Sequence, residues 1–327
     1  MPEPHIHSSS MKFLFNIAIL ILFVTIFGCS SATEEEELAP RENPLAMNSS
    51  YINGQWLSDD GSFSNQIFYS VNGIFQSEEP AHIDTVIDLQ GTYVVPPFGD
   101  AHNHAFGDRY SVGFSDDVFL ARGFFYGMNL TNPYSSAAAL IDTLSQPETI
   151  DVAFSHGGIS APKGSRPHPA TVMERVYSYL TSDTTSQWPL EGDAYWFMTS
   201  EAQIEAKWPQ LMDQEPDVVK VYIMRYGEDS PDLPECGYGL CPEELEIITD
   251  SAHANNKRVF AHVNTARDFQ LALDVGVDGI AHLPLGNDGV TIEDAEPLTL
   301  ADSTVQQAGD MGIILTPTAH LLTRDLE

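Results

Sequence analysis

The residues with the clearest chemical potential are two histidines separated by one residue in segment 94–104. A β-branched pair there is followed by a Pro/Gly break and then by Asp100, His102 and His104. Residues i and i+2 of an extended chain point to the same side, so these three side chains share one face. Two neutral imidazoles at the end of a strand can provide half of a metal site.

Three further potential ligands occur in short apolar segments downstream. They are Lys220 in segment 218–223, His262 in segment 258–263 and His282 at the end of segment 277–282. Each is late or last in a segment that reads as a strand. One buried histidine alone is often a core residue, but five ligand-type residues at the same end of four strands are not what a core-histidine model predicts. We therefore expect these five side chains to meet.

Beyond Pro97, predicted strands alternate with predicted helices, which is typical of a parallel sheet. Thr265 with Asp268 is a helix start signal, and Gly276 is a stop signal. Reactive groups of (β/α)8 barrels lie at the carboxyl ends of the strands. The predicted fold class is therefore α/β, a TIM-like (β/α)8 barrel that lacks its eighth strand. The expected strands are 94–98, 124–130, 151–155, 218–224, 258–263, 279–282 and 312–316, and the expected helices include 170–180, 201–212, 242–255 and 265–275.

Residues 49–96 form a different, turn-rich region with alternating apolar residues. Asn72-Gly73 between two apolar segments is a strong hairpin signal. We predict a small N-terminal β-sandwich part that leads into the barrel, which occupies residues 97–327.

The charge balance excludes one class of partner. The chain has 14 Lys+Arg against 47 Asp+Glu, a formal net charge of −33 at pH 7. This charge repels phosphate backbones and anionic membrane surfaces within a Debye length of about 8–10 Å. We expect a small-molecule substrate and no nucleic-acid partner, and the sequence leaves the oligomeric state open.

The first residues read as a targeting segment. Lys12 precedes the apolar run 13–28, which ends at Cys29 and is followed by small residues. The pattern resembles a bacterial lipoprotein signal, with Met11 as the initiator and Cys29 as the lipidated residue; the alternative is a plain secretory signal with an incidental cysteine. We therefore expect a signal segment 1–29, an acidic linker 30–48, and an exported protein held by a lipid anchor on the bacterial cell envelope, facing the periplasm or on the cell surface.

The two other cysteines, Cys236 and Cys241, are close in the sequence. An exported protein meets an oxidising compartment, where such a pair can form a disulfide. A zinc site at this position needs two more ligands, which the sequence does not offer nearby. A disulfide and free thiols remain the two alternatives.

His102-Asn-His104, Lys220, His262 and His282 together, in this order, resemble the amidohydrolase superfamily. Segments 261–264 and 272–284 are similar to its imidazolonepropionase-related branch. The resemblance covers the chain from about Ser49 onward.

The resemblance implies a site with two divalent metal ions. By it, His102 and His104 hold the more buried ion, His262 and His282 hold the more exposed one, and Lys220 bridges both as a carbamate formed with CO2. An ammonium group repels two cations, whereas a carbamate offers two anionic oxygens. Neutral imidazoles favour Zn²⁺, and Mn²⁺ and Fe²⁺ accept the same residue types.

The implied reaction is hydrolysis of a C–N bond by a metal-bound hydroxide. A deaminase branch carries a Glu shortly after His262, and segment 263–266 has none, which favours an amide, lactam, peptide or ester substrate. Tyr222 shares a strand face with Lys220 and is a candidate donor to a developing oxyanion. His156, beside the Gly-rich loop 157–160, is a candidate substrate contact. The structural alternatives are a tyrosine that fills the barrel mouth and a locally bonded loop histidine.

The chain departs from the family pattern in one respect. The family carries an Asp after the eighth strand as metal ligand and general base, and Asp325 follows the strand expected at 312–316 too closely to take that place. We therefore expect an incomplete copy with weak or no activity. The alternatives are a non-catalytic surface lipoprotein with a ligand-binding barrel and a phosphotriesterase-like hydrolase. The remaining histidines are expected to be surface or locally bonded residues: His82, His168, His253 and His320.

Overall fold

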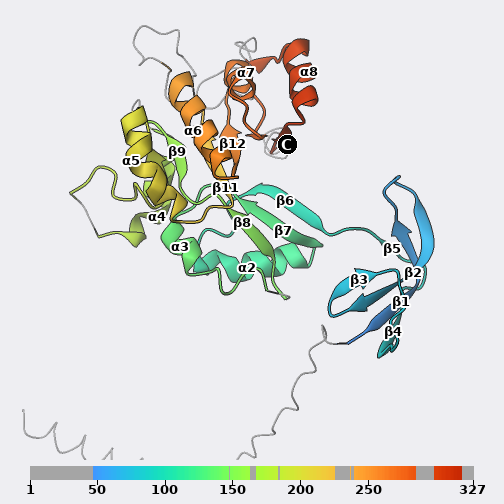
Figure 1. Ribbon diagram of the computed structural model, residues 1–327. Helices are drawn as coiled ribbons and strands as arrows, with labels where there is room; N and C mark the ends of the chain where they lie inside the picture. Colours follow the sequence, from blue (N-terminus) through green and yellow to red (C-terminus); the bar gives the residue numbers. More distant parts are fainter. Residues whose placement is uncertain are drawn as a thin grey trace, which may run out of the picture. The chain divides into compact units, whose positions relative to one another are not determined.

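The computed structural model describes residues 47–146, 148–162, 167–182, 185–224, 236, 239–284 and 298–318. The chain divides into two compact units, Met1–Val95 and Pro96–Glu327, and each is considered by itself (Figure 1). The predictions for the signal segment, for Cys29, for linker residues up to 46, and for His320 and Asp325 lie outside the described residues. Among the residues that are described, no helix is long and apolar enough to span a bilayer.

The N-terminal unit contains one sheet in the order β3-β2-β1-β4, with β5 also paired to β1. Asn72 and Gly73 have φ angles of 51° and 80° between β2 and β3, so the predicted two-residue hairpin turn is confirmed. The predicted sandwich is not formed by the described residues, because β4 and β5 both pair with β1 rather than forming a second layer. The strands are β1 Ser49–Leu57, β2 Phe63–Val71, β3 Ile74–Gln76, β4 Thr85–Asp88 and β5 Tyr93–Val94.

The second unit is built from parallel strands in two sheets, with orders β6-β7-β8 and β10-β9-β11-β12-β13-β14. Two hydrogen bonds join the end of β8 to the residue before β11: the Asp217 amide donates to the Phe154 carbonyl, and the Phe154 amide donates to Asp217 Oδ2, both at 2.8 Å. The strands are β6 Phe98–Asn103, β7 Phe124–Asn129, β8 Asp151–Phe154, β9 Gly158–Ser160, β10 Tyr195–Phe197, β11 Val218–Tyr222, β12 Arg258–His262, β13 Gly279–Ala281 and β14 Ile314–Thr316.

The prediction of an α/β fold with parallel strands is confirmed, while the described strands do not form a closed barrel. The first strand was misplaced: Tyr93–Val94 pairs with β1 of the other unit, and the strand with the histidines begins at Phe98. Pro96 and Pro97 lie between them, and proline has no N–H to donate to a sheet. The short strands β9 and β10 were not predicted, because three residues show no recognisable alternation.

Helices cover the outside of the sheets, for example α2 on β7 and α6 on β12 (Figure 1). The predicted start of α7 is confirmed, because Thr265 and Asp268 form a reciprocal capping box. The helices are α2 Arg109–Leu120, α3 Tyr134–Ala138, α4 Ala170–Tyr177, α5 Glu201–Met212, α6 Pro242–Ala254, α7 Ala266–Asp274 and α8 Asp302–Met311, with a 3-10 turn η2 Ser178–Leu180.

Strand alternation decides which side chains face inward in β11 and β12. Val219 and Val221 are buried in the helix-covered core, so Lys220 and Tyr222 point to the opposite face. On that inner face a small apolar cluster lies beside them: Leu130, Val218, Phe260 and Ala281. The sequence pattern of β11 therefore places an amine and a phenol inside the fold.

Candidate active site

Four of the predicted ligands form a continuous arc of imidazole rings. His102 lies in β6, His104 directly follows it, His262 ends β12 and His282 directly follows β13. The ring centroids of His102 and His104 are 5.6 Å apart, those of His102 and His282 4.6 Å, and those of His262 and His282 4.7 Å. The structure thus brings together all four histidines from positions up to 180 residues apart in sequence.

Lys220 completes the group. Its side chain is 1% exposed, and in the described part of the chain its Nζ has no hydrogen-bond partner. A positive charge on Lys220 acts on each of the four imidazoles. A buried ammonium without an anionic partner is costly, so this side chain is not explained by folding alone.

Burial favours the uncharged form of all these groups, and nearby positive charges add to this effect for the histidines. Burial lowers the pKa of Lys220 to about 7. Burial, followed by the Lys220 charge, lowers the pKa of His102 to about 2 and that of His282 to about 3. Burial also holds the pKa of His262 well below its usual value. Although solvent reaches His104, the surrounding protein lowers its pKa as well. Neutral imidazoles have free lone pairs, as metal ligands must.

Hydrogen bonds orient the four rings. Two of the partners are carbonyl oxygens, which require an N–H from the ring: the Thr131 carbonyl for His104 Nδ1 and the Asn264 amide oxygen for His262 Nε2. These bonds leave Nε2 of His104 and Nδ1 of His262 as acceptors. The distances are 3.2 Å for His104–Thr131, 2.9 Å for His262–Asn264, 2.8 Å for His282 Nδ1–Thr318 Oγ1 and 3.4 Å for His102 Nδ1–Thr316 Oγ1.

His282 reaches the arc through an unusual backbone conformation. Ala281 is paired with His262 in the sheet and belongs to the inner cluster, so a regular continuation of β13 turns the next side chain outward. His282 instead has φ 75°, in the left-handed region. Such a conformation costs on the order of 1–3 kcal/mol in a non-glycine residue and is typical of functional sites.

Tyr222 and His168 extend the arc beyond His262. The ring of Tyr222 is 5.0 Å from that of His262, and its hydroxyl bonds Thr131 Oγ1 at 2.7 Å. His168 lies 5.1 Å from Tyr222 and 5.2 Å from His262. We expected His168 to be a surface or local residue, and this was wrong: it precedes α4 outside every strand, so strand periodicity carried no signal for it.

His156 is not brought to the arc. It is 2% exposed, stacks on Phe154 with centroids 5.6 Å apart and meets the edge of Tyr134 at 5.2 Å. Val152 and Phe154, four and two residues before it, belong to the helix-covered core, so this face of β8 looks outward. A contact of His156 with substrate remains a prediction.

A carboxylate also lies near the arc. Asp100 in β6 accepts a hydrogen bond from the His102 amide at 3.1 Å, and its charge offsets a small part of the lowering of the His104 pKa by desolvation. The sequence predicted that Asp100 shares one face of its strand with His102 and His104, and this prediction put Asp100 near the arc.

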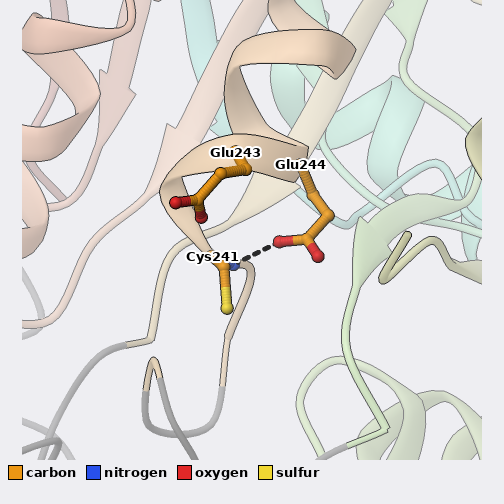
Figure 2. Close-up of side chains that lie close together, drawn as sticks. All are labelled: Cys241, Glu243 and Glu244. Atoms are coloured by element: carbon orange, nitrogen blue, oxygen red, sulfur yellow. Dashed lines mark hydrogen bonds between the residues drawn. The ribbon is translucent and has the colours of Figure 1, made fainter. Parts of the chain in front are cut away.

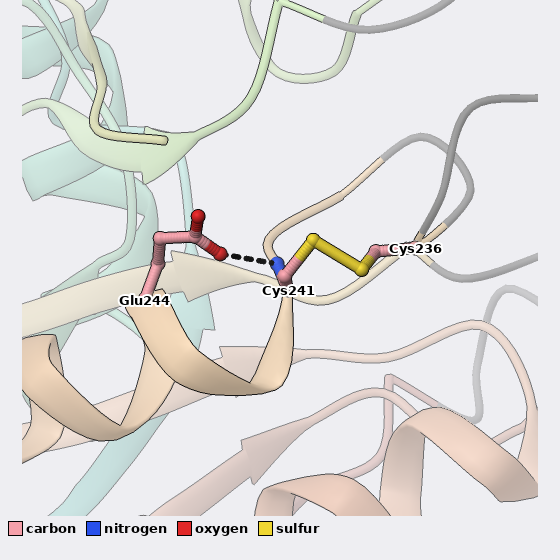
Figure 3. The surroundings of a disulfide bond; sticks show 3 residues. All are labelled: Cys236, Cys241 and Glu244. Atoms are coloured by element: carbon pink, nitrogen blue, oxygen red, sulfur yellow. Dashed lines mark hydrogen bonds between the residues drawn. A yellow bond between two sulfur atoms is a disulfide. The ribbon is translucent and has the colours of Figure 1, made fainter. Parts of the chain in front are cut away.

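A second group of potential ligands is Cys241, Glu243 and Glu244 at the start of α6 (Figure 2). Their ligand atoms lie within 4.8 Å of one another, a condition that no three side chains of the histidine arc meet among the described residues. Cys241 is, however, bonded to Cys236 in a disulfide with the Cα atoms 5.2 Å apart, and its amide donates to Glu244 at 3.1 Å (Figure 3). The cysteine alternatives are thus resolved as a disulfide, and its sulfur is not a free thiolate ligand.

No protein-family model and no curated protein sequence matches the chain. Solved structures share its fold. An Xaa-Pro dipeptidase with bound methionine has a TM-score of 0.62 at 14% identity, covering 84% of this chain and 67% of that one. A prolidase complexed with N-methylphosphonate-L-proline has a TM-score of 0.58 at 17% identity, covering 83% of this chain and 66% of the prolidase. An A. niger ochratoxinase has a TM-score of 0.56 at 17% identity, covering 83% of this chain and 64% of the ochratoxinase.

At 14–17% identity these solved structures show that the chain shares their fold, and one of them is described as an amidohydrolase. The chain spans about two thirds of the length of these proteins, 66% for the prolidase. What the neighbours hydrolyse is a property of those proteins.

Proposed function

We propose that this chain forms the metal-binding part of an amidohydrolase that hydrolyses a C–N bond in an amide, lactam or peptide. The observation that carries the proposal is Lys220, a buried amine with no hydrogen-bond partner among the described residues, beside four neutral imidazoles. The solved structures with this fold include prolidases and a molinate hydrolase, which supports the same class of reaction.

The donor set fits divalent metal ions. Neutral imidazole nitrogen suits Zn²⁺ best, and Mn²⁺ and Fe²⁺ accept the same donors. The imidazoles form an extended arc rather than a cluster around one point. This arrangement would suit two ions better than one. We assign His102 and His104 to one ion and His262 and His282 to the other.

Lys220 is proposed to bridge the two ions as a carbamate. With its pKa lowered to about 7, a large share of the amine is neutral at neutral pH, and the neutral amine is the form that reacts with CO2. An N–C bond forms, one N–H proton is released to solvent, and the product is an anion with two oxygens. The orphaned donor thereby becomes a pair of acceptors between two cation positions.

When bound, the ions would polarise the scissile carbonyl and lower the pKa of a nucleophilic water. Burial raises the pKa of Tyr222, so its hydroxyl stays protonated and can donate to a developing oxyanion. Its present partner, Thr131 Oγ1, holds that hydroxyl at the arc. His168 lies beside Tyr222 and is placed to contact the same substrate group. We assign no described residue as the general base.

We further propose that the protein is exported and lipid-anchored through Cys29. The support is the lipoprotein-like segment ending at Cys29 and the Cys236–Cys241 disulfide, since disulfides persist mainly in oxidising compartments. Labelling of cells with a radioactive fatty acid tests it: incorporation into the wild-type chain and not into Cys29→Ser is expected, and equal labelling of both would contradict it.

The experiment that tests the function begins with metal content. After loading with Zn²⁺ and dialysis, elemental analysis is expected to find about two ions per chain, and fewer in Lys220→Met. Lys257→Met, at a partly exposed lysine just before β12, is the matched control. A ¹³C carbamate resonance from labelled CO2 is expected in the wild type and not in Lys220→Met. Hydrolysis of a library of dipeptides and N-acyl amino acids is then assayed beside phosphoesters. A chain that retains no metal above background would end the proposal.

A further inference from the structure

A crevice of about 310 Å³ lies on the outer face of β8, between the segment after α3 and the end of α5. Neither Lys220 nor any histidine of the arc is among its lining residues. The residues that matter for its chemistry are Tyr134, Phe154, His156, Gln214, Glu215 and Asp217. It is therefore a second concave surface of the same unit, with a different set of side chains.

His156 presents an unpartnered nitrogen in this crevice. The residue is 2% exposed, and among the described residues its Nδ1 has no hydrogen-bond partner. Burial lowers the pKa of His156 to about 4, so the ring is neutral near pH 7 and one of its two nitrogens carries a lone pair. A ligand that donates a hydrogen bond selects the tautomer with this lone pair on Nδ1. A buried acceptor without a donor costs about 1–3 kcal/mol, so a ligand that donates to it is favoured.

Gln214 presents a second unpartnered acceptor. Its Nε2 donates to the Gly192 carbonyl at 2.7 Å, which fixes the orientation of the amide. Its Oε1 is buried and has no partner in the described part of the chain. Both orphaned atoms in the crevice therefore require a hydrogen-bond donor.

The carboxylates that line the crevice also prefer a hydrogen-bond donor. Glu215 and Asp217 carry carboxylates, and the one bond from Asp217 Oδ2 to the Phe154 amide leaves acceptor capacity on that side chain. The other walls are apolar or aromatic, from Tyr134, Leu144 and Val152. Carboxylates repel an anion, and aromatic faces attract a cation.

We propose that this crevice binds a small organic cation, a primary ammonium with an apolar body. The ammonium N–H groups donate to His156 Nδ1 and Gln214 Oε1, and the positive charge faces Glu215 and Asp217. The apolar body lies against Leu144 and Val152. Water satisfies the two orphaned acceptors but uses neither the carboxylates nor the apolar walls, so the ammonium is the better complement.

Titration calorimetry of the full chain tests the proposal at pH 7.5 and 0.15 M NaCl, where general attraction to an acidic protein is screened. The probes are benzylamine, benzyl alcohol and benzoate. The protein is first stripped of metal, so that an amine cannot report on the candidate active site. We expect one saturable benzylamine site, at least about 10-fold weaker binding of the alcohol, and no binding of benzoate, because only the amine offers a charged donor.

Variants then localise the binding. Gln214→Leu removes a buried acceptor and is expected to weaken benzylamine at least about 10-fold. Glu215→Gln removes an exposed charge and is expected to weaken it about 2- to 5-fold. Asp213→Asn, an exposed acid that does not line the crevice, removes the same charge and is expected to change nothing.

Equal affinity for amine and alcohol, an absence of saturation, or equal effects of Asp213→Asn and Glu215→Gln would overturn the proposal. If circular dichroism shows that Gln214→Leu does not fold, the comparison of Glu215→Gln with Asp213→Asn decides, since both change exposed side chains.

Discussion

The histidine arc and the outer crevice both contain a buried histidine near the end of a strand, yet their chemistry is opposite in kind. His262 lies among other nitrogen bases with lone pairs and near Lys220, whose amine has no hydrogen-bond partner in the described part of the chain. His156 lies among aromatic rings and lines the same crevice as Glu215 and Asp217. The first set suits metal ions and the second suits an organic ammonium. The residue type is the same, and the neighbours from adjacent elements make the difference.

The largest effect on activity is expected from removing the amine of Lys220 beside the histidine arc. Lys220→Met keeps the length of the side chain and removes the amine, so kcat/KM is expected to fall at least about 10³-fold, as when an essential catalytic group is lost. The same change removes a buried polar group without a partner, so the metal-free protein is expected to become more stable, by about 1–3 kcal/mol. Steady-state kinetics measure the change in kcat/KM, and urea unfolding of the metal-free protein measures the change in stability. A destabilised metal-free variant would show that Lys220 is a structural residue.

The crevice histidine is expected to show itself in the pH dependence of stability. Burial lowers the pKa of His156 from 6.5 to about 4. The contribution of this neutral ring to the free energy of unfolding is therefore fully present above pH 6.5 and is lost as the pH falls. The reason is that the ring binds a proton in the unfolded state at a higher pH than in the folded state. The loss amounts to about 3 kcal/mol by pH 4.

The comparison that isolates this effect is His156→Asn, since asparagine tolerates the left-handed φ of 52° at this position. Its free energy of unfolding is expected to fall less steeply between pH 7 and pH 4 than that of the wild type, with all other groups held in common. Equal slopes for the two proteins would contradict the assignment of a neutral buried ring.

Tyr222 tests whether the inner face of β11 does chemistry. Tyr222→Phe is expected to lower kcat by about 10- to 100-fold with little change in KM, because an oxyanion donor acts mainly in the transition state. The loss of its bond to Thr131 Oγ1 is expected to cost about 1 kcal/mol in stability. Thr131→Val, which removes the same bond and keeps the phenol, is the matched control. If both variants lower kcat equally, Tyr222 is a positioning residue.

The histidine arc and the outer crevice also differ in how much of each could be predicted from the sequence. Short apolar runs rich in β-branched residues predicted β11 and β12, and the late positions of Lys220 and His262 in them predicted that the two side chains meet. His168 lies at the site from a position outside any strand, and His282 through a left-handed φ, so periodicity could neither find the first nor orient the second. The outer crevice joins β8 to the end of α5, about 60 residues later, and no local pattern reports such packing.

The smallest effect is expected from changing Asn264, which orients the ring of His262. Asn264 accepts the Nε2–H of His262 at 2.9 Å and thereby leaves Nδ1 as the free lone pair. Partners of this kind are worth about 10- to 100-fold in metal affinity, and a neutral amide oxygen is a weaker acceptor than a carboxylate. Asn264→Leu is therefore expected to weaken Zn²⁺ binding by about 10-fold, measured by competition with a chelating dye. Asn264→Asp strengthens the acceptor and adds charge beside the cations, so it is expected to bind Zn²⁺ at least as tightly as the wild type. Equal weakening in both variants would mean that Asn264 acts through packing, and that the tautomer of His262 is set by something else.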